Sequence, residues 1–222
     1  MKMRTLLAVI VGLAGILYSA WVLEFVLDTG LDPMRSFLSE LDAANRPFRE
    51  VFSWGDRITG TLALIGAAIG LSILPRRRLT VVGWSAFGVF GASTIADALA
   101  PIECIPGIDP GCPSGPSGLF PQLHHIHALT SSVAVFAIFV TMVTFTLAAR
   151  RYGSWPLLRT WGLAVFVVVT VTTAWMLIAD NLPGDYSLGL AQRIQIAGMS
   201  VWMVMLGVAS YRTPAVTWKG HP

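Results

Sequence analysis

Charged residues are scarce in this 222-residue chain: Asp, Glu, Lys and Arg together make up 12% of it. An average soluble domain contains about 25%. Hydrophobic residues make up 55%, and they collect in several long runs that carry almost no charge. The composition therefore indicates an all-α, polytopic membrane protein rather than a soluble domain.

The sequence also lacks an internal repeat, a low-complexity tract and a linker to a second domain. We therefore expect a single membrane domain over residues 1–222. The formal net charge of +3 comes from basic residues that are dispersed at the ends of the apolar runs. Such a dispersed charge does not indicate nucleic-acid binding, and membrane lipid is the expected partner.

Six apolar segments approach the length of about 20 residues that a helix needs to cross a bilayer. A cleavable signal peptide is the alternative interpretation of the first, but its apolar run exceeds the roughly 7–15 residues of a signal-peptide core. The second contains Gly66 and Gly70, a spacing that lets another helix approach closely. The predicted transmembrane helices cover residues 6–27, 58–74, 79–99, 128–149, 160–179 and 194–211.

Basic residues concentrate at one set of segment ends. Lysine and arginine in short loops mark the cytoplasmic side of a membrane, so we expect both termini in the cytoplasm. The acids form a separate regularity, because all 12 lie at or near the opposite ends. The basic residues at the predicted cytoplasmic ends are Lys2, Arg4, Arg76, Arg77, Arg78, Arg150, Arg151, Arg159, Arg212 and Lys219.

The chain has only two cysteines, Cys104 and Cys112, both in a Pro- and Gly-rich segment between the third and fourth predicted helices. Two cysteines in one extracytoplasmic loop favour a disulfide, and two free thiols are the alternative. A disulfide would brace the loop that leads into the fourth helix.

Three of the four histidines, His124, His125 and His127, fall at the start of that fourth helix. Helical spacing places His124, His127 and Ser131 on one face and turns His125 away from it. Asp97 lies near the end of the third predicted helix, where burying an unpaired charge costs about 2.5–3.5 kcal/mol. The sequence therefore predicts a polar cluster between these two helices.

A metal site is one hypothesis for this cluster. Zn²⁺ binds His nitrogen and carboxylate oxygen, and catalytic sites use about three protein ligands plus water, so His124, His127 and Asp97 are the candidate ligands. The protein would then be a metal-dependent hydrolase acting on a lipid or lipid-linked substrate at the outer leaflet. The candidate catalytic residues around the metal are Asp56, Glu40 and Ser131, with Asp56 or Glu40 as a base.

The alternative is a non-enzymatic protein that binds a lipid or a protein partner, in which the polar groups tie helix ends together. Charges at membrane depth need partners whether or not they act in catalysis. A bis-histidine haem and a transport path fit less well, because no opposed histidines and no charged or broken helix centres occur at mid-membrane depth. The candidate structural partners are Glu24, Arg57, Asp180, Gln192 and Arg193.

Five short motifs occur in a characteristic order: Ser39-Glu40-Leu41, Asp56-Arg57-x-x-Gly60, Asp97, His124-x-x-His127-Ala128 and Gly189-x-x-Gln192-Arg193. In this order they resemble the bacterial membrane family called domain of unknown function 998, over roughly residues 6–211. The resemblance implies a six-helix bundle in the bacterial inner or plasma membrane and no settled activity. A weaker likeness is to alkaline-ceramidase-type membrane hydrolases, which use histidines, an aspartate and a serine around zinc. The chain departs from them in having six spans and no His-x-x-x-His pair in its last helix.

Overall fold

The computed structural model describes residues 2–106, 108–112, 126–182 and 184–212. Throughout these residues the regular structure is helical, and six helices are long and apolar enough to cross a membrane. The predicted all-α, six-helix fold is therefore confirmed. The spans are Lys2–Phe25, Arg49–Ile73, Arg78–Leu99, Ile126–Tyr152, Leu158–Ala179 and Leu188–Arg212.

Several helices extend beyond the apolar segments that the sequence marked. Helix α2 (Arg49–Ile73) begins at Arg49 rather than at residue 58, and α6 (Leu188–Arg212) begins at Leu188 rather than at residue 194. Hydropathy detects long apolar runs, whereas these N-terminal extensions carry polar residues, of which Ser53 and Arg193 are buried against protein. The remaining spans contain α3 (Arg78–Leu99), α4 (Ile126–Tyr152) and α5 (Leu163–Ala179), which follows a π-helical turn, η4 (Leu158–Gly162).

The first span is not a uniform α-helix. Helix α1 (Lys2–Leu17) ends after two-thirds of the crossing, and a 3-10 helix, η1 (Ala20–Phe25), completes it. A second 3-10 helix, η2 (Leu38–Asp42), lies in the segment between the first and second spans. Both 3-10 helices contribute side chains to the cavity described below.

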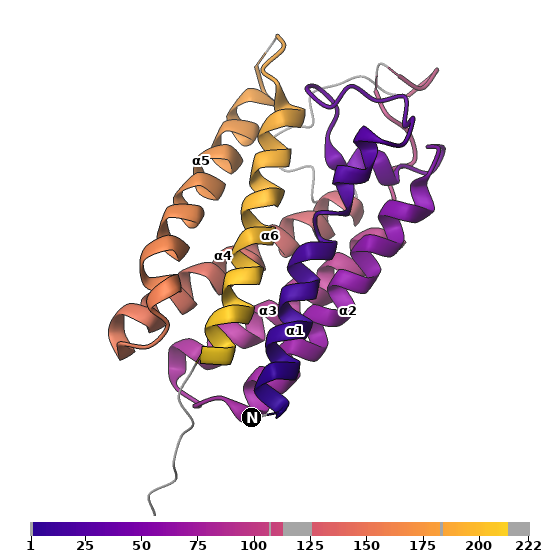
Figure 1. Ribbon diagram of the computed structural model, residues 1–222. Coiled ribbons are helices and arrows are strands. Elements are labelled where there is room, and N and C mark those ends of the chain that lie inside the picture. Colours follow the sequence, from indigo (N-terminus) through magenta and orange to yellow (C-terminus); the bar gives the residue numbers. More distant parts are fainter. Residues whose placement is uncertain (1, 107, 113–125, 183, 213–222) are drawn as a thin grey trace, which may run out of the picture.

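The long helices pack side by side (Figure 1), and aromatic side chains fill the centre of the bundle. Helix α1 contacts α2 and α6, α3 contacts α2 and α4, and α5 packs chiefly on α6. Trp84, Phe87, Phe145 and Trp202 are fully buried in the core. The rings of Trp84 and Phe145 meet edge to face with centroids 5.0 Å apart, a geometry that contributes about 0.5–1.5 kcal/mol beyond area burial.

Glycines bring α2 and α3 into backbone contact. A Cβ atom built on Gly91 would lie 2.6 Å from the carbonyl oxygen of Gly60, and one built on Gly60 would lie 2.5 Å from the carbonyl oxygen of Gly91. Gly66 lies against α1, and a Cβ on Gly70 would lie 2.5 Å from the ring of Trp84 in α3. The small-residue positions of α2 therefore lie inside the bundle, as predicted.

The segment after α3 contains the disulfide between Cys104 and Cys112, which confirms the predicted bond. Between the two cysteines, Asp109 accepts a hydrogen bond of 2.7 Å from the backbone N–H of Ile105 and forms an ion pair with Arg46. The disulfide loop is therefore attached to the segment that precedes α2.

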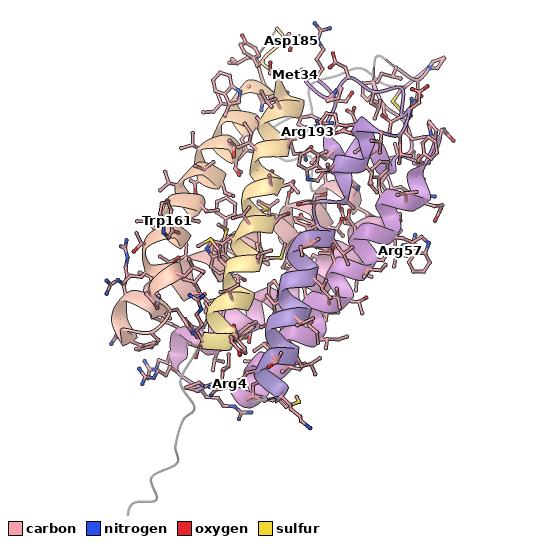
Figure 2. The ribbon with its side chains drawn as sticks, in the orientation of Figure 1. Arg4, Met34, Arg57, Trp161, Asp185 and Arg193 are labelled. Carbon is pink, nitrogen blue, oxygen red and sulfur yellow. A yellow bond between two sulfur atoms is a disulfide. The ribbon has the colours of Figure 1, made fainter. Side chains whose placement is uncertain are left out.

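The two ends of the bundle differ in the residues they carry. Figure 2 shows Arg4 at the end that also holds the N-terminus, whereas Met34, Asp185 and Arg193 lie toward the opposite end. The segment between the first and second spans and the segment between the fifth and sixth spans therefore lie at the same end of the bundle. The assignment of the Arg4 end to the cytoplasm stays a prediction from the distribution of basic residues.

Candidate functional site

A cavity of about 330 Å³ lies at the end of the bundle opposite to the N-terminus. Its volume falls in the range of small-molecule sites, about 300–1,000 Å³. The wall is built from the end of α1, both 3-10 helices and the cavity-side ends of α2, α3, α4 and α6. The side chains on this wall that matter most for chemistry are Tyr18, Asp42, Asp56, Asp97, His127 and Ser131.

Asp97 is the centre of a hydrogen-bonded cluster that joins α3 to α4. Its Oδ1 atom accepts hydrogen bonds from Ser131 Oγ at 2.8 Å and from Thr130 Oγ1 at 2.5 Å. His127 Nδ1 lies 3.3 Å from the same oxygen and 3.2 Å from the carbonyl oxygen of Ala100. These contacts supply the partners that a carboxylate within a membrane span requires.

His127 lies between Asp97 and Ser131. Its Nδ1 atom faces Asp97, and its Nε2 atom is 3.4 Å from Ser131 Oγ. When Nδ1 carries the proton and donates it to an oxygen, Nε2 is left as an acceptor. The ring can therefore take a proton from the serine hydroxyl or from a water molecule.

Two further carboxylates line the cavity from other elements. Asp56 comes from α2, and the structure shows no hydrogen bond or ion pair to it from the described residues. Asp42 ends η2, is only 7% exposed, and its Oδ1 atom lies 3.5 Å from Arg49 Nε. That Oδ1 atom accepts no hydrogen bond from any described residue. The described residues that line the wall include no lysine or arginine, so Arg49 contacts Asp42 from outside that wall.

The environment of Asp42 changes its proton affinity. Burial is the main cause that raises the pKa of its carboxyl group from 3.8 to about 7. Arg49 and Arg57, both in α2, act against this rise, while Asp97 and Glu50 add to it. Burial likewise raises the pKa of Glu40 above its ordinary value.

We expect the free energy of unfolding to fall as the pH rises from about 4 to about 7 because of Asp42. The folded chain binds the proton of Asp42 more tightly than the unfolded chain, so protonation stabilises the fold and this stabilisation is lost through the folded-state pKa. Asp42→Asn mimics the protonated group. Its melting temperature should match the wild type near pH 4 and exceed it by a few degrees near pH 8. An unchanged difference across this range would contradict the assignment.

Glu24 and Arg193 form a buried ion pair between η1 and α6. Arg193 Nε donates a hydrogen bond to Glu24 Oε1 at 2.7 Å. The side chain of Arg193 is 5% exposed and that of Glu24 is 1% exposed. Arg193 Nη1 also donates to the carbonyl oxygens of Ser36 and Gly189, at 2.8 and 2.9 Å. Beside it, Gln192 accepts a hydrogen bond from the backbone N–H of Leu38. Together these contacts hold the segment before η2 against α6.

The other predicted site residues lie elsewhere. Arg57 donates a hydrogen bond of 3.4 Å to the carbonyl oxygen of Ala98 and stacks over Trp54, so the structure does not pair it with Glu24. Glu40 is partly buried in η2 but does not line the cavity, and Asp180 is exposed at the end of α5. The predictions for His124 and His125 fall outside the described residues.

Only part of the predicted metal site can be compared with the structure. Asp97 and His127 are in contact, as the hypothesis requires. The described residues contain no group of three or more His, Cys, Asp or Glu side chains placed to hold a metal ion. The third predicted ligand, His124, is not among those residues, so the complete set stays a prediction.

Sequence reasoning missed Thr130, which hydrogen-bonds to Asp97, and two residues that line the cavity, Asp42 and Trp21. Thr130 is three positions from His127, and the helical spacing that selected Ser131 also places Thr130 near that face. Asp42 and Trp21 gave no such signal, because they belong to 3-10 helices whose position depends on tertiary contacts. Finding Asp42 would have required a prediction of where the segment between the first two spans folds back, and finding Trp21 a prediction that the first span changes to a 3-10 helix.

Comparison with known proteins yields one match. The family described as "Protein of unknown function (DUF998)" matches residues 10–209, which is most of the chain. No curated protein and no solved structure matches the chain. A function therefore has to be inferred from the geometry of the cavity.

Proposed function

The chain belongs to the DUF998 family of unknown function, and from its cavity we propose that it is a membrane hydrolase acting on a lipid or lipid-linked substrate. The observation that supports this proposal is the order of three side chains on the cavity wall. Asp97 lies 3.3 Å from one ring nitrogen of His127, and Ser131 lies 3.4 Å from the other. A carboxylate that orients an imidazole beside a hydroxyl is an arrangement that activates an oxygen nucleophile.

In the proposed reaction, Asp97 holds the ring of His127 through Nδ1, and Nε2 accepts the proton. The proton comes from Ser131, whose hydroxyl turns from Asp97 to His127, and its oxygen then attacks an acyl carbonyl of the substrate. His127 returns the proton to the leaving alcohol or amine. Water, activated by the same ring, releases the acid and restores the hydroxyl of Ser131.

The composition of the wall supports an amphiphilic substrate. Beside the polar cluster, the cavity is lined by Trp21, Phe37, Phe52, Val135 and Ile196. A reacting ester or amide group can contact the polar residues while an acyl chain contacts the apolar ones. The cavity also lies at an end of the spans, where the head-group region of a bilayer is close.

One form of the proposal includes Zn²⁺ as a cofactor at this cluster. His127 and Asp97 carry the ligand types that zinc prefers, and their contact fits a shared ligand set. His124 would complete the set of three protein ligands. A bound Zn²⁺ would act as a Lewis acid on the substrate carbonyl and lower the pKa of a bound water molecule.

The test is hydrolysis of p-nitrophenyl esters with acyl chains of 4 to 16 carbons, a range chosen to span about one bilayer leaflet, by the full chain in maltoside micelles. We expect Ser131→Ala, His127→Ala and Asp97→Asn each to lower the rate by about 10²–10⁴-fold, the contribution typical of a general base. Ser132→Ala, a neighbouring hydroxyl on the same wall, is the matched control and should retain the wild-type rate. Equal rates in Ser131→Ala and Ser132→Ala would reject a role for Ser131.

Metal analysis of the same preparations separates the two forms of the proposal. Stoichiometric zinc that disappears in His124→Ala and His127→Ala, but not in His125→Ala, supports the metal-dependent form. Hydrolysis that persists in a metal-free preparation and still requires Ser131 supports the serine form.

A non-enzymatic binding protein is the second candidate function, and one observation favours it. Asp97 accepts hydrogen bonds from both Thr130 and Ser131 of α4, so the cluster also ties α3 to α4. If that is its only role, Asp97→Asn should change the melting temperature slightly and leave ligand binding intact. A carboxamide is cheaper to bury than a carboxylate, so this variant can even be stabilised.

A further inference from the structure

The hydrolase chemistry leaves part of the cavity without a role. Asp97 is engaged with α4, but Asp42 and Asp56 face the same space from η2 and α2. Arg49, whose Nε atom lies 3.5 Å from Asp42 Oδ1, is the cation beside Asp42, and no lysine or arginine stands among the described residues of the wall. Carboxylates that share a partly buried cavity repel one another and are poorly solvated. The raised pKa of Asp42 is one result of this environment. A positively charged ligand would relieve both effects.

Two buried atoms in residues that line the cavity have no hydrogen-bond partner in the described structure. One is the acceptor Oδ1 of Asp42, a residue that is more than nine-tenths buried, and the other is the donor Nε1 of Trp21. Most buried polar atoms in folded proteins are paired, and the contact with Arg49 Nε at 3.5 Å only partly satisfies Asp42 Oδ1. The carboxyl group of Asp42 therefore keeps capacity for a further donor or cation beside η2.

Aromatic side chains occupy much of the remaining wall. Tyr18 and Trp21 come from the first span, Phe37 precedes η2, and Phe52 comes from α2. Aromatic rings attract organic cations, most strongly when the cation is desolvated, and cages of such rings recognise substituted ammonium groups. Phosphate or carboxylate groups would meet three aspartates and no lysine or arginine among the described residues of the wall.

We propose that this cavity binds the alkylammonium head group of a cationic amphiphile, with Asp42 and Asp56 as its anionic partners. The inference rests on the proposed function, because it names the substrate class for the same cavity. An organic cation suits these carboxylates better than a metal ion, since they come from different elements and do not form a metal-ligand group among the described residues. The apolar wall then contacts the chain of the amphiphile.

Binding of decyltrimethylammonium and of decyl sulfate, measured by tryptophan fluorescence on the full chain in maltoside micelles, tests the proposal. The two probes share a chain length and differ in the sign of the head-group charge. We expect the ammonium probe to bind at least about tenfold more tightly, since its cation meets carboxylates at low local dielectric. Asp42→Asn and Asp56→Asn should each weaken its binding by about tenfold or more, and neither should change binding of the sulfate probe.

Asp28→Asn is the matched control, because it removes the same charge from an exposed position at the same end of the bundle. Equal or tighter binding of the sulfate probe would overturn the proposal, as would ammonium binding that is insensitive to both aspartates. Binding of added Zn²⁺ that requires Asp42 and Asp56, without ammonium binding, would also overturn it. Since no reaction is measured, this result is separate from the ester assay: Ser131-dependent hydrolysis of uncharged esters can persist when cation binding fails.

Discussion

Arg193→Ala is expected to lower the free energy of unfolding by about 3–5 kcal/mol, the cost of leaving one member of a buried ion pair without its partner. Glu24 would remain with 1% of its side chain exposed and no guanidinium beside it. The carbonyl oxygens of Ser36 and Gly189 would lose their donor in the same step. Unfolding of the purified chain by titration with sodium dodecyl sulfate measures this loss.

A double variant separates charge burial from loss of packing. Glu24→Leu combined with Arg193→Met removes both charges and keeps most of the side-chain volume, so it should recover much of the stability that Arg193→Ala loses. Its remaining deficit reports the two carbonyl hydrogen bonds of Arg193. If Arg193→Ala cost less than about 1 kcal/mol, the pair would be behaving as a surface salt bridge, in conflict with its burial.

Gly91→Ala is expected to lower the free energy of unfolding by about 1–3 kcal/mol, because overpacking forces backbone shifts. The added methyl group would lie 2.6 Å from the carbonyl oxygen of Gly60 and 3.0 Å from the backbone nitrogen of Leu64. Neither atom can move without separating α2 from α3. The same detergent titration measures the effect.

Gly88→Ala provides the matched control on the same helix. A Cβ atom at Gly88 would lie 3.5 Å from the side chain of Ala67, an ordinary contact. Alanine has a higher helix propensity than glycine by about 1 kcal/mol, so this variant should be neutral or stabilised. Destabilisation of both variants by the same amount would show that the close contact at Gly91 is not the cause.

The fold was largely predictable because its strongest determinant is local. Six apolar runs of membrane-spanning length predict six helices, and two cysteines in one loop predict their bond. The helix starts at Arg49 and Leu188 were not predictable from hydropathy, because these N-terminal extensions contain polar residues and some of them, Ser53 and Arg193, are buried by tertiary contacts. For the same reason the 3-10 continuation of α1 gave no signal in the sequence.

The candidate site was predictable where helical spacing determines it. His127 and Ser131 are four residues apart on α4, and the structure places them in contact. Asp97 belongs to the preceding helix, α3, and it contacts His127 and Ser131 because α3 and α4 pack antiparallel. Asp42 could not be foreseen, since its position depends on how the segment between the first two spans attaches to α2 and α6. Long-range contacts of single polar residues leave no periodic pattern.

The pair between Glu24 and Arg193 joins the first span to the last, across 169 positions of sequence. During synthesis the N-terminal part of a chain emerges first, so Glu24 is made before nearly all of the remaining spans. The carboxylate of Glu24 therefore cannot pair with the guanidinium of Arg193 until α6 has been synthesised and inserted. Formation of the pair marks completion of the bundle, and a chain that ends before α6 retains an uncompensated acid at membrane depth.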